Sequence, residues 1–198
     1  MKIFVVLGAD RVGKTTSIQN TVAFLKESGQ TSRIWHFSEV KPWHHSPIDQ
    51  FLEKFDELDC EALTDRPDYL FIDRFVSDTL FYEPERNRFA RMSEHWADTV
   101  ESRIWKYGCE VQYVVINRLW DSELINRHKR ELLKTWEACC PPGESVSKYY
   151  LDLNLAVRKK EHVRYYSHTS RFFDSRDIRY VTLFDKSPDS SLNLLKDI

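Results

Sequence analysis

Features that mark secreted, zinc-binding or membrane-spanning proteins are scarce in this sequence. No apolar run approaches the ~18 residues that a membrane-spanning helix needs, and the first residues lead directly into an apolar strand pattern rather than a signal peptide. The four cysteines, Cys60, Cys109, Cys139 and Cys140, form no C-x-x-C pair and have no histidines at zinc-ligand spacing. We therefore expect reduced thiols, a cytoplasmic protein (in the host cytoplasm if the source is viral) and no membrane partner.

Net charge is also low, at −2, but its sign changes along the chain. Residues 37–101 contain 16 Asp and Glu against 7 Lys and Arg, a balance of −9. Residues 102–180 contain 15 Lys and Arg against 10 Asp and Glu, a balance of +5. A face that handles phosphate groups is expected in the second, basic part, with solvated helix faces of mixed charge as the alternative.

Only five glycines occur, and two of them lie close together after the apolar strand pattern Ile3–Leu7. Gly8–Thr15 matches G-x-x-x-x-G-K-[ST], in which backbone N–H groups surround phosphate oxygens and a helix N-terminus faces them. We expect Lys14 as an exposed loop residue on the β- and γ-phosphates, and the Thr15 hydroxyl on Mg²⁺. A chance match in a glycine turn is the alternative. The pattern predicts ATP and Mg²⁺ as cofactors, with contacts from Gly8, Ala9, Asp10, Arg11, Val12, Gly13, Lys14, Thr15 and Thr16.

The other patterns alternate helices with short apolar strands, which indicates an α/β fold. We expect a single three-layer domain over residues 1–198, with a parallel sheet of about five strands flanked by helices. In the longest helix, Leu151, Leu155 and Val163 are expected to form the buried stripe. The predicted strands are 3–7, 33–37, 69–75, 111–116 and 179–184, and the predicted helices are 15–27, 48–58, 92–106, 146–173 and 190–195.

The loop GADRVGKTT resembles the phosphate loop of eukaryotic-type thymidylate kinases, which carry an Asp-Arg pair at the positions of Asp10 and Arg11. The resemblance implies the P-loop kinase fold, with Arg11 on the transferred phosphoryl group and Asp10 near the acceptor's sugar. A guanidinium presents a planar fork of donors to phosphate oxygens, which suits the first role. An exposed ion pair between Arg11 and a nearby carboxylate is the alternative.

A second stretch, Tyr69–Phe75 (YLFIDRF), resembles the Asp-Arg-Tyr type of motif in the same kinases. At the carboxyl end of a central parallel strand, its side chains would point into the ligand crevice. The resemblance implies Asp73 near Mg²⁺ and the acceptor, with Arg74 and Phe75 on the substrate. An aspartate that caps the next helix is the alternative. Glu39, after the second strand, is a further catalytic candidate that could orient a Mg²⁺-bound water or an acceptor hydroxyl.

Residues 117–133 resemble the lid entry of nucleoside and nucleotide kinases, where cations lie over the ATP phosphates. Asp121, Arg127 and Arg130 match the spacing of that pattern, and the two arginines, three residues apart, share one helix face. The resemblance implies a lid-like segment around residues 118–148. A solvated surface helix is the alternative.

The acceptor region departs from thymidylate kinases. No arginine follows the second strand, where that family grips the acceptor's phosphate, and the interval before Tyr69 lacks the family's arginine and aromatic pair. Further on, Arg86, Arg88 and Arg91 are interleaved with aromatic residues, a pattern suited to stacking on a base and contacting backbone phosphates. The packing edge of a helix is the alternative for this segment. A thymidine-like acceptor within DNA is therefore favoured, as in phage kinases of 5-hydroxymethyluracil. A thymidylate (dTMP) kinase making dTDP and a non-catalytic NTP-binding switch are the alternatives, and a homodimer is left open.

Overall fold

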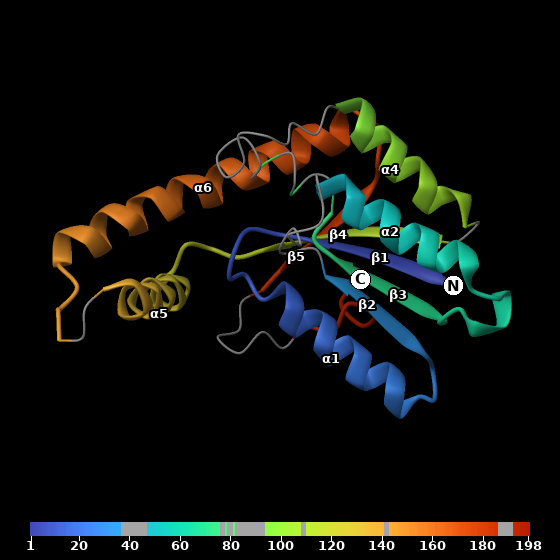
Figure 1. Ribbon diagram of the computed structural model, residues 1–198, viewed down its shortest axis with the longest axis horizontal. Coiled ribbons are helices and arrows are strands. Elements are labelled where there is room, and N and C mark those ends of the chain that lie inside the picture. Colours follow the sequence, from blue (N-terminus) through green and yellow to red (C-terminus); the bar gives the residue numbers. More distant parts are fainter. Residues whose placement is uncertain are drawn as a thin grey trace.

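Five parallel strands form one sheet in the order β2-β3-β1-β4-β5 (Figure 1). The computed structural model describes residues 1–36, 47–75, 78, 81, 94–107, 110–140, 143–185 and 192–198. The expected α/β fold with a five-stranded parallel sheet is confirmed. The strands are β1 (Lys2–Leu7), β2 (Ser32–His36), β3 (Tyr69–Asp73), β4 (Glu110–Asn117) and β5 (Tyr180–Phe184). The helices are α1 (Lys14–Glu27), α2 (Pro47–Cys60), α4 (Glu94–Lys106), α5 (Ser122–Cys139) and α6 (Lys148–Asp174), with a 3₁₀ turn η1 (Leu63–Asp65).

The first strand, β1, lies at the centre of this sheet. It pairs with β3 on one side and β4 on the other, so that Val5 lies level with Ile72 and with Tyr113. All five residues from Ile3 to Leu7 are buried, because helices cover both faces of a parallel sheet and leave no polar face. The loop after β1 therefore begins at the middle of the sheet's carboxyl edge.

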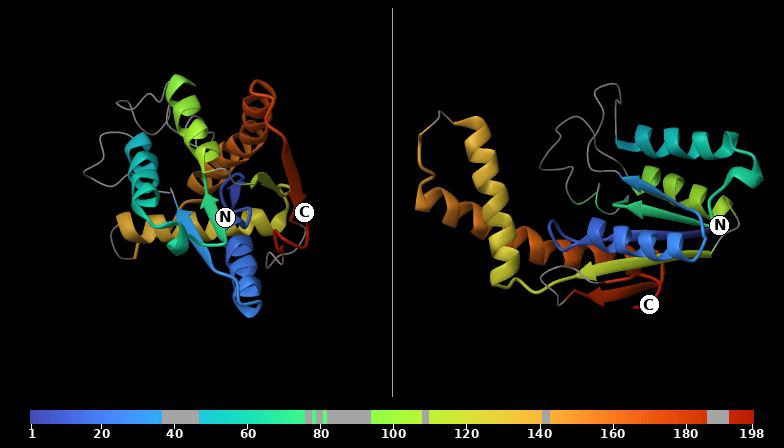
Figure 2. Two further views of the ribbon diagram at one scale, coloured as in Figure 1. Left: turned by 90° about the vertical axis from the view of Figure 1, so that its right-hand side faces the viewer. Right: turned by 90° about the horizontal axis from the view of Figure 1, so that it is seen from below.

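Helices cover the sheet on both faces (Figures 1 and 2). On one face, Ile18 and Leu25 of α1 pack with Phe4 and Val6 of β1. The other face is covered by α2, α4 and the carboxyl-terminal part of α6, so the molecule has three layers. The core on that second face includes Phe51, Phe55, Leu58, Val100, Ile104, Phe172 and Phe173.

The long helix α6 reaches well past the sheet, and α5 lies beside its outer half (Figure 1). The side chains that α6 buries are His162, Tyr165, Thr169, Phe172 and Phe173. The expected stripe was wrong, because Val163 is 62% exposed and Leu151 and Leu155 are only partly buried. One residue turns an α-helix by about 100°, so Val163 faces away from the side that His162 and Tyr165 bury.

The predicted closing helix 190–195 is also wrong for the part of it that the structure describes. Residues 192–198 form a turn, in which the Asn193 N–H donates to Asp197 Oδ2 at 2.7 Å. Leu194 is buried against α1, and its N–H donates to Thr21 Oγ1 at 2.9 Å. A segment this short gains too few helical hydrogen bonds to offset the cost of helix nucleation. The buried Leu194 side chain and its hydrogen bond to α1 fix the turn in place instead.

Two further observations concern membrane spans and cysteines. None of the described helices combines the length and the apolar character needed to cross a bilayer. Cys60, Cys139 and Cys140 are free thiols, and Cys109 lies outside the described residues.

Candidate functional site

The loop between β1 and α1 passes very close to β4. A Cβ atom on Gly8 would lie 2.6 Å from the carbonyl oxygen of Ile116 and 2.8 Å from Cγ2 of Val12. Gly13, with φ at 99°, is the residue before the first turn of α1. Glycine is required at both positions, at the first by the neighbouring backbone and at the second by the left-handed conformation.

Lys14 was expected to be exposed, but it is buried, with only 6% of its surface exposed. Its Nζ donates to the carbonyl oxygens of Gly8 at 2.7 Å and Ala9 at 2.9 Å. The ammonium therefore lies inside the curl of the loop, where two carbonyl oxygens take the place of some of the water molecules it would contact in solution. Burial, with the positive charge of Arg74, lowers the pKa of Lys14.

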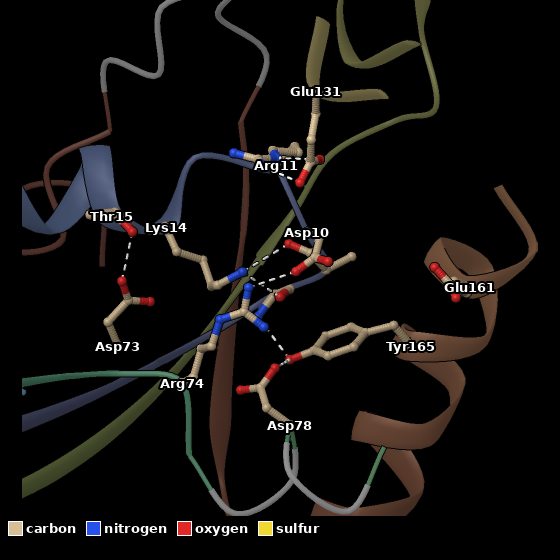
Figure 3. Close-up of polar contacts among 12 residues, drawn as sticks. Asp10, Arg11, Lys14, Thr15, Asp73, Arg74, Asp78, Glu131, Glu161 and Tyr165 are labelled. Atoms are coloured by element: carbon tan, nitrogen blue, oxygen red, sulfur yellow. Dashed lines mark hydrogen bonds and ion pairs between the residues drawn. The ribbon is translucent and has the colours of Figure 1, made fainter. Parts of the chain in front are cut away.

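Thr15 and Asp73 meet where β3 ends, as Figure 3 shows. The Thr15 hydroxyl donates to Asp73 Oδ2 at 2.6 Å, and Asp73 is 0% exposed. His36 Nδ1 lies 2.8 Å from the same oxygen. His36 was not predicted from the sequence, although this residue ends β2 directly beside Asp73 in the register of the two strands.

The oxygen atoms of this pair fit a hard cation. Oδ1 of Asp73 is buried and has no hydrogen-bond partner among the residues that the structure describes. A hydroxyl and a carboxylate with a spare oxygen are the kind of protein ligands that Mg²⁺ uses together with water and phosphate oxygens. Groups of three or more His, Cys, Asp or Glu suited to a metal are absent from the described ranges, so any metal here would rely on such external oxygens.

The two Asp-Arg motifs of the sequence meet each other in space. Arg74 Nη2 lies 2.6 Å from Asp10 Oδ1 (Figure 3). Both arginines of these motifs have a left-handed backbone, with φ at 68° for Arg11 and 72° for Arg74. The ion pair therefore joins the phosphate loop to the end of β3.

Phe75 does not join this cluster. It is 1% exposed and packs edge to face on Phe51, with 5.2 Å between ring centroids. The structure thus places Phe75 in the core beneath α2, because its apolar ring gains more from that contact than from a charged cleft.

Arg11 contacts α5. Its Nε donates to Glu131 Oε2 at 2.8 Å, and its Nη2 pairs with Glu131 Oε1 (Figure 3). Arg127 Nη1 donates to the carbonyl oxygen of Arg11 at 3.1 Å. The ion pair named above as the alternative for Arg11 is therefore present, and α5 holds both the side chain and the backbone of this residue.

A buried hydrogen-bond chain supports the loop from α6. The Gly8 N–H donates to the Tyr165 hydroxyl at 2.9 Å, and this hydroxyl donates to Asp78 Oδ1 at 2.7 Å. The Phe75 N–H donates to Asp78 Oδ2 at 3.1 Å. Burial raises the pKa of Asp78, and the charges of Arg74 and Lys14 oppose that shift. Tyr165 and Asp78 were not predicted from the sequence, because no local pattern marks them as partners of the loop.

A cleft of about 730 Å³ opens beside these groups. It brings together the phosphate loop, the ends of β2 and β3, and α5 and α6, and α5 crosses the carboxyl edge of the sheet from the β4 side toward the β2 side (Figure 2, right). Seven of its thirteen lining residues are Lys or Arg and two are Asp or Glu, so the cleft suits a ligand with several negative charges. Its cations are Arg11, Lys14, Arg74, Arg127, Arg130, Lys134 and Arg158.

Both lid arginines line this cleft, with 18% of the Arg127 side chain and 65% of the Arg130 side chain exposed. Arg127 and Arg130 each contact Glu123, at 3.4 Å and 3.3 Å. Asp121 caps α5 instead of facing the cleft, because its Oδ1 accepts the Leu124 N–H at 2.8 Å. Four other predicted site residues, Glu39, Arg86, Arg88 and Arg91, lie outside the described residues.

Comparisons with known proteins identify no family. No protein-family model matches the chain, and neither does any curated protein. The chain is similar to the crystal structure of APE1195, with 14% identity and a TM-score of 0.40, covering 80% of this chain and 95% of that one. It is also similar to the solution NMR structure of a de novo designed protein with the P-loop NTPase fold, with 11% identity and a TM-score of 0.30, covering 91% of this chain and 99% of that one. At these scores neither likeness supports a function, and the fold rests on the sheet and loop described above.

Proposed function

We propose that this protein is a kinase that transfers the γ-phosphoryl group of ATP to a thymidine-like acceptor. The observation that carries the proposal is the meeting of Lys14, the Thr15 and Asp73 pair and the cations of α5 and α6 in one cleft. Phosphoryl transfer depends mainly on positioning and on charge stabilisation, and these are the groups that supply both.

Each of these residues has a role in the proposal. Backbone N–H groups of the loop from Ala9 to Thr16 and the Lys14 ammonium bind the phosphates, and Arg11 stabilises the charge on the transferred group. Thr15 and Asp73 would hold Mg²⁺, which neutralises phosphate charge when bound. Arg127 and Arg130 cover the donor from a lid formed by residues 118–148, within a single domain.

For the acceptor, we propose the hydroxymethyl group of 5-hydroxymethyluracil in DNA. Its oxygen would form a new bond to the γ-phosphorus, the bond to the β-phosphate oxygen would break, and ADP and the hydroxyl proton would leave. Two observations support a polymer. After the second strand, the sequence lacks the arginine with which thymidylate kinases grip the acceptor's phosphate. The cleft cations also continue along α5 to Lys134, one turn beyond Arg130.

A dTMP kinase is the second candidate, and Arg74 is the observation that favours it. This arginine lines the cleft directly after Asp73, where the resemblance places a contact to the acceptor's phosphate. Its ion pair with Asp10 would have to loosen or share donors with that phosphate.

One transfer experiment separates these functions. ATP labelled on the γ-phosphate is offered in parallel with dTMP, other deoxynucleoside monophosphates, and DNA that contains 5-hydroxymethyluracil. Label in the modified DNA alone supports the proposal, and label in dTDP supports the second candidate. Nucleotide binding with no transfer to any acceptor would contradict both and identify a switch.

A further inference from the structure

Arg11 is held in one orientation by contacts from α5. Glu131 approaches the Nε and Nη2 side of its guanidinium, while Arg127 holds its carbonyl oxygen at 3.1 Å. The side chains of Arg11 and Glu131 are 48% and 36% exposed, and both line the cleft beside Lys14. The pair is therefore a wall of the cleft and not a contact on the outer surface.

The geometry of the pair leaves donors for a second anion. A guanidinium has five N–H groups, and a two-point contact through Nε and Nη2 uses one hydrogen on each. The two hydrogens of Nη1 and one of Nη2 remain. Because the guanidinium is planar and rigid, fixing its Nε side also fixes the direction of these remaining donors.

We propose that Glu131 is a positioning residue for Arg11, which it holds at the cleft with the Nη1 side directed to the transferred phosphoryl group. This inference rests on the proposed function, in which Arg11 stabilises that group. An arginine without such a partner would lose rotamer freedom only when the nucleotide binds, whereas here that cost is met before binding.

Electrostatics keep the pair ionised. The hydrogen bonds from Arg11 lower the pKa of Glu131 and raise the pKa of Arg11, so Glu131 remains a carboxylate at neutral pH. Its negative charge beside the phosphates costs little, because a half-exposed pair is screened by solvent. Positioning is therefore its main effect on turnover.

Replacing Glu131 by glutamine tests this role. Glu131→Gln keeps the size of the side chain but offers a single acceptor oxygen, so the two-point contact is lost. We expect kcat to fall about tenfold while KM for ATP rises by only about threefold, since the contact is strongest in the transition state. Glu131→Asp should recover part of the loss. Glu137→Gln, an exposed change on the same helix, is the control and should match the wild type.

A double-mutant cycle with Arg11→Ala gives the decisive comparison. If Glu131 acts only through Arg11, Glu131→Gln should have little further effect on kcat once Arg11 is alanine. Additive losses, an unchanged kcat or a raised kcat in Glu131→Gln would overturn the inference, and a raised kcat would show that Glu131 sequesters Arg11. Thermal unfolding of each variant excludes a change in folding.

A binding arm keeps the test independent of the proposed function. If the wild type transfers phosphate to no acceptor, the kinase proposal fails. The inference is then tested by the dissociation constants of ADP and of a non-hydrolysable ATP analogue. Glu131→Gln should reduce the preference for the triphosphate by about threefold or more, because a disordered Arg11 contacts the γ-phosphate less well. An unchanged preference would overturn the inference.

Discussion

The hydroxyl of Tyr165 is a small group whose removal should weaken the phosphate loop. It accepts the Gly8 N–H and donates to Asp78, and Tyr165 is completely buried. Tyr165→Phe leaves the ring in the core but deprives a buried backbone N–H of its acceptor and a buried carboxyl of a donor.

The magnitude follows from these two groups. A buried polar group left without its partner costs about 1–3 kcal/mol. Asp78 keeps the hydrogen bond from the Phe75 N–H, so its share lies at the low end of that range, about 1 kcal/mol, and we expect a total loss of about 2–4 kcal/mol. For a chain of this length, each kcal/mol lowers Tm by about 2–4 °C, which gives a fall of roughly 5–15 °C. The pKa of Asp78 should also rise further, because the hydrogen bond that Tyr165 donates lowers it.

Circular dichroism melting and urea unfolding measure this loss directly. Tyr149→Phe on the same helix is the matched control, because Tyr149 is 77% exposed and its hydroxyl lies in solvent. The affinity for ATP, measured by calorimetry, should fall in Tyr165→Phe because Gly8 begins the loop. A Tm within about 1 °C of the wild type would refute the reasoning, since it would mean that neither group depends on the hydroxyl.

Three further predictions concern charged residues. Lys14→Ala should lower kcat about 100-fold or more, which steady-state kinetics measures. The same change should cost about 1–3 kcal/mol of stability in thermal melting, because two loop carbonyls lose their donor. Retention of a tenth or more of the activity would contradict the first expectation. Burial raises the pKa of Glu101 from 4.5 to about 7, so the folded protein binds the extra proton and its stability should fall as pH rises through that window. Glu101→Gln should remove this fall in stability, which is worth about 3 kcal/mol at pH 8. Urea unfolding of the wild type and of Glu101→Gln at pH 5 and pH 8 measures the difference, and an equal pH dependence in the two proteins would contradict the prediction. Lys134→Ala should weaken binding of hydroxymethyluracil DNA and reduce its salt slope by about 1, whereas Lys129→Ala, on the opposite face of α5, should not; equal effects in fluorescence anisotropy would exclude a DNA track along the cleft face.

The fold was predictable because its elements are marked locally. The apolar run Ile3–Leu7 and the glycine loop after it identify the central strand and the phosphate loop without knowledge of any tertiary contact. The errors in the predicted fold arose where the local sequence is compatible with two conformations or with burial of two helix faces. Leu194 could have begun a helix but anchors a turn on α1, and Val163 lies one residue from the side of α6 that is buried.

Contacts between distant residues could not be predicted in the same way. Glu131 lies 120 residues from Arg11, and Tyr165 lies 157 residues from Gly8. Which α5 and α6 side chains reach the loop depends on how these helices leave the sheet, and no periodicity encodes that path. His36 shows a milder case, because its position beside Asp73 follows once β2 and β3 are known to be neighbours.

The continuity of α6 constrains how the cleft can close. Its 27 residues, Lys148–Asp174, contain neither proline nor glycine, so the helix has no hinge along about 40 Å of length. Its carboxyl end is fixed by Phe172 and Phe173 in the core, and its outer half carries α5. A flap that swings open as one body would have to break this helix. Any approach of α5 to a bound nucleotide must instead be a shear, in which α5 slides and rolls by small steps over a stationary α6.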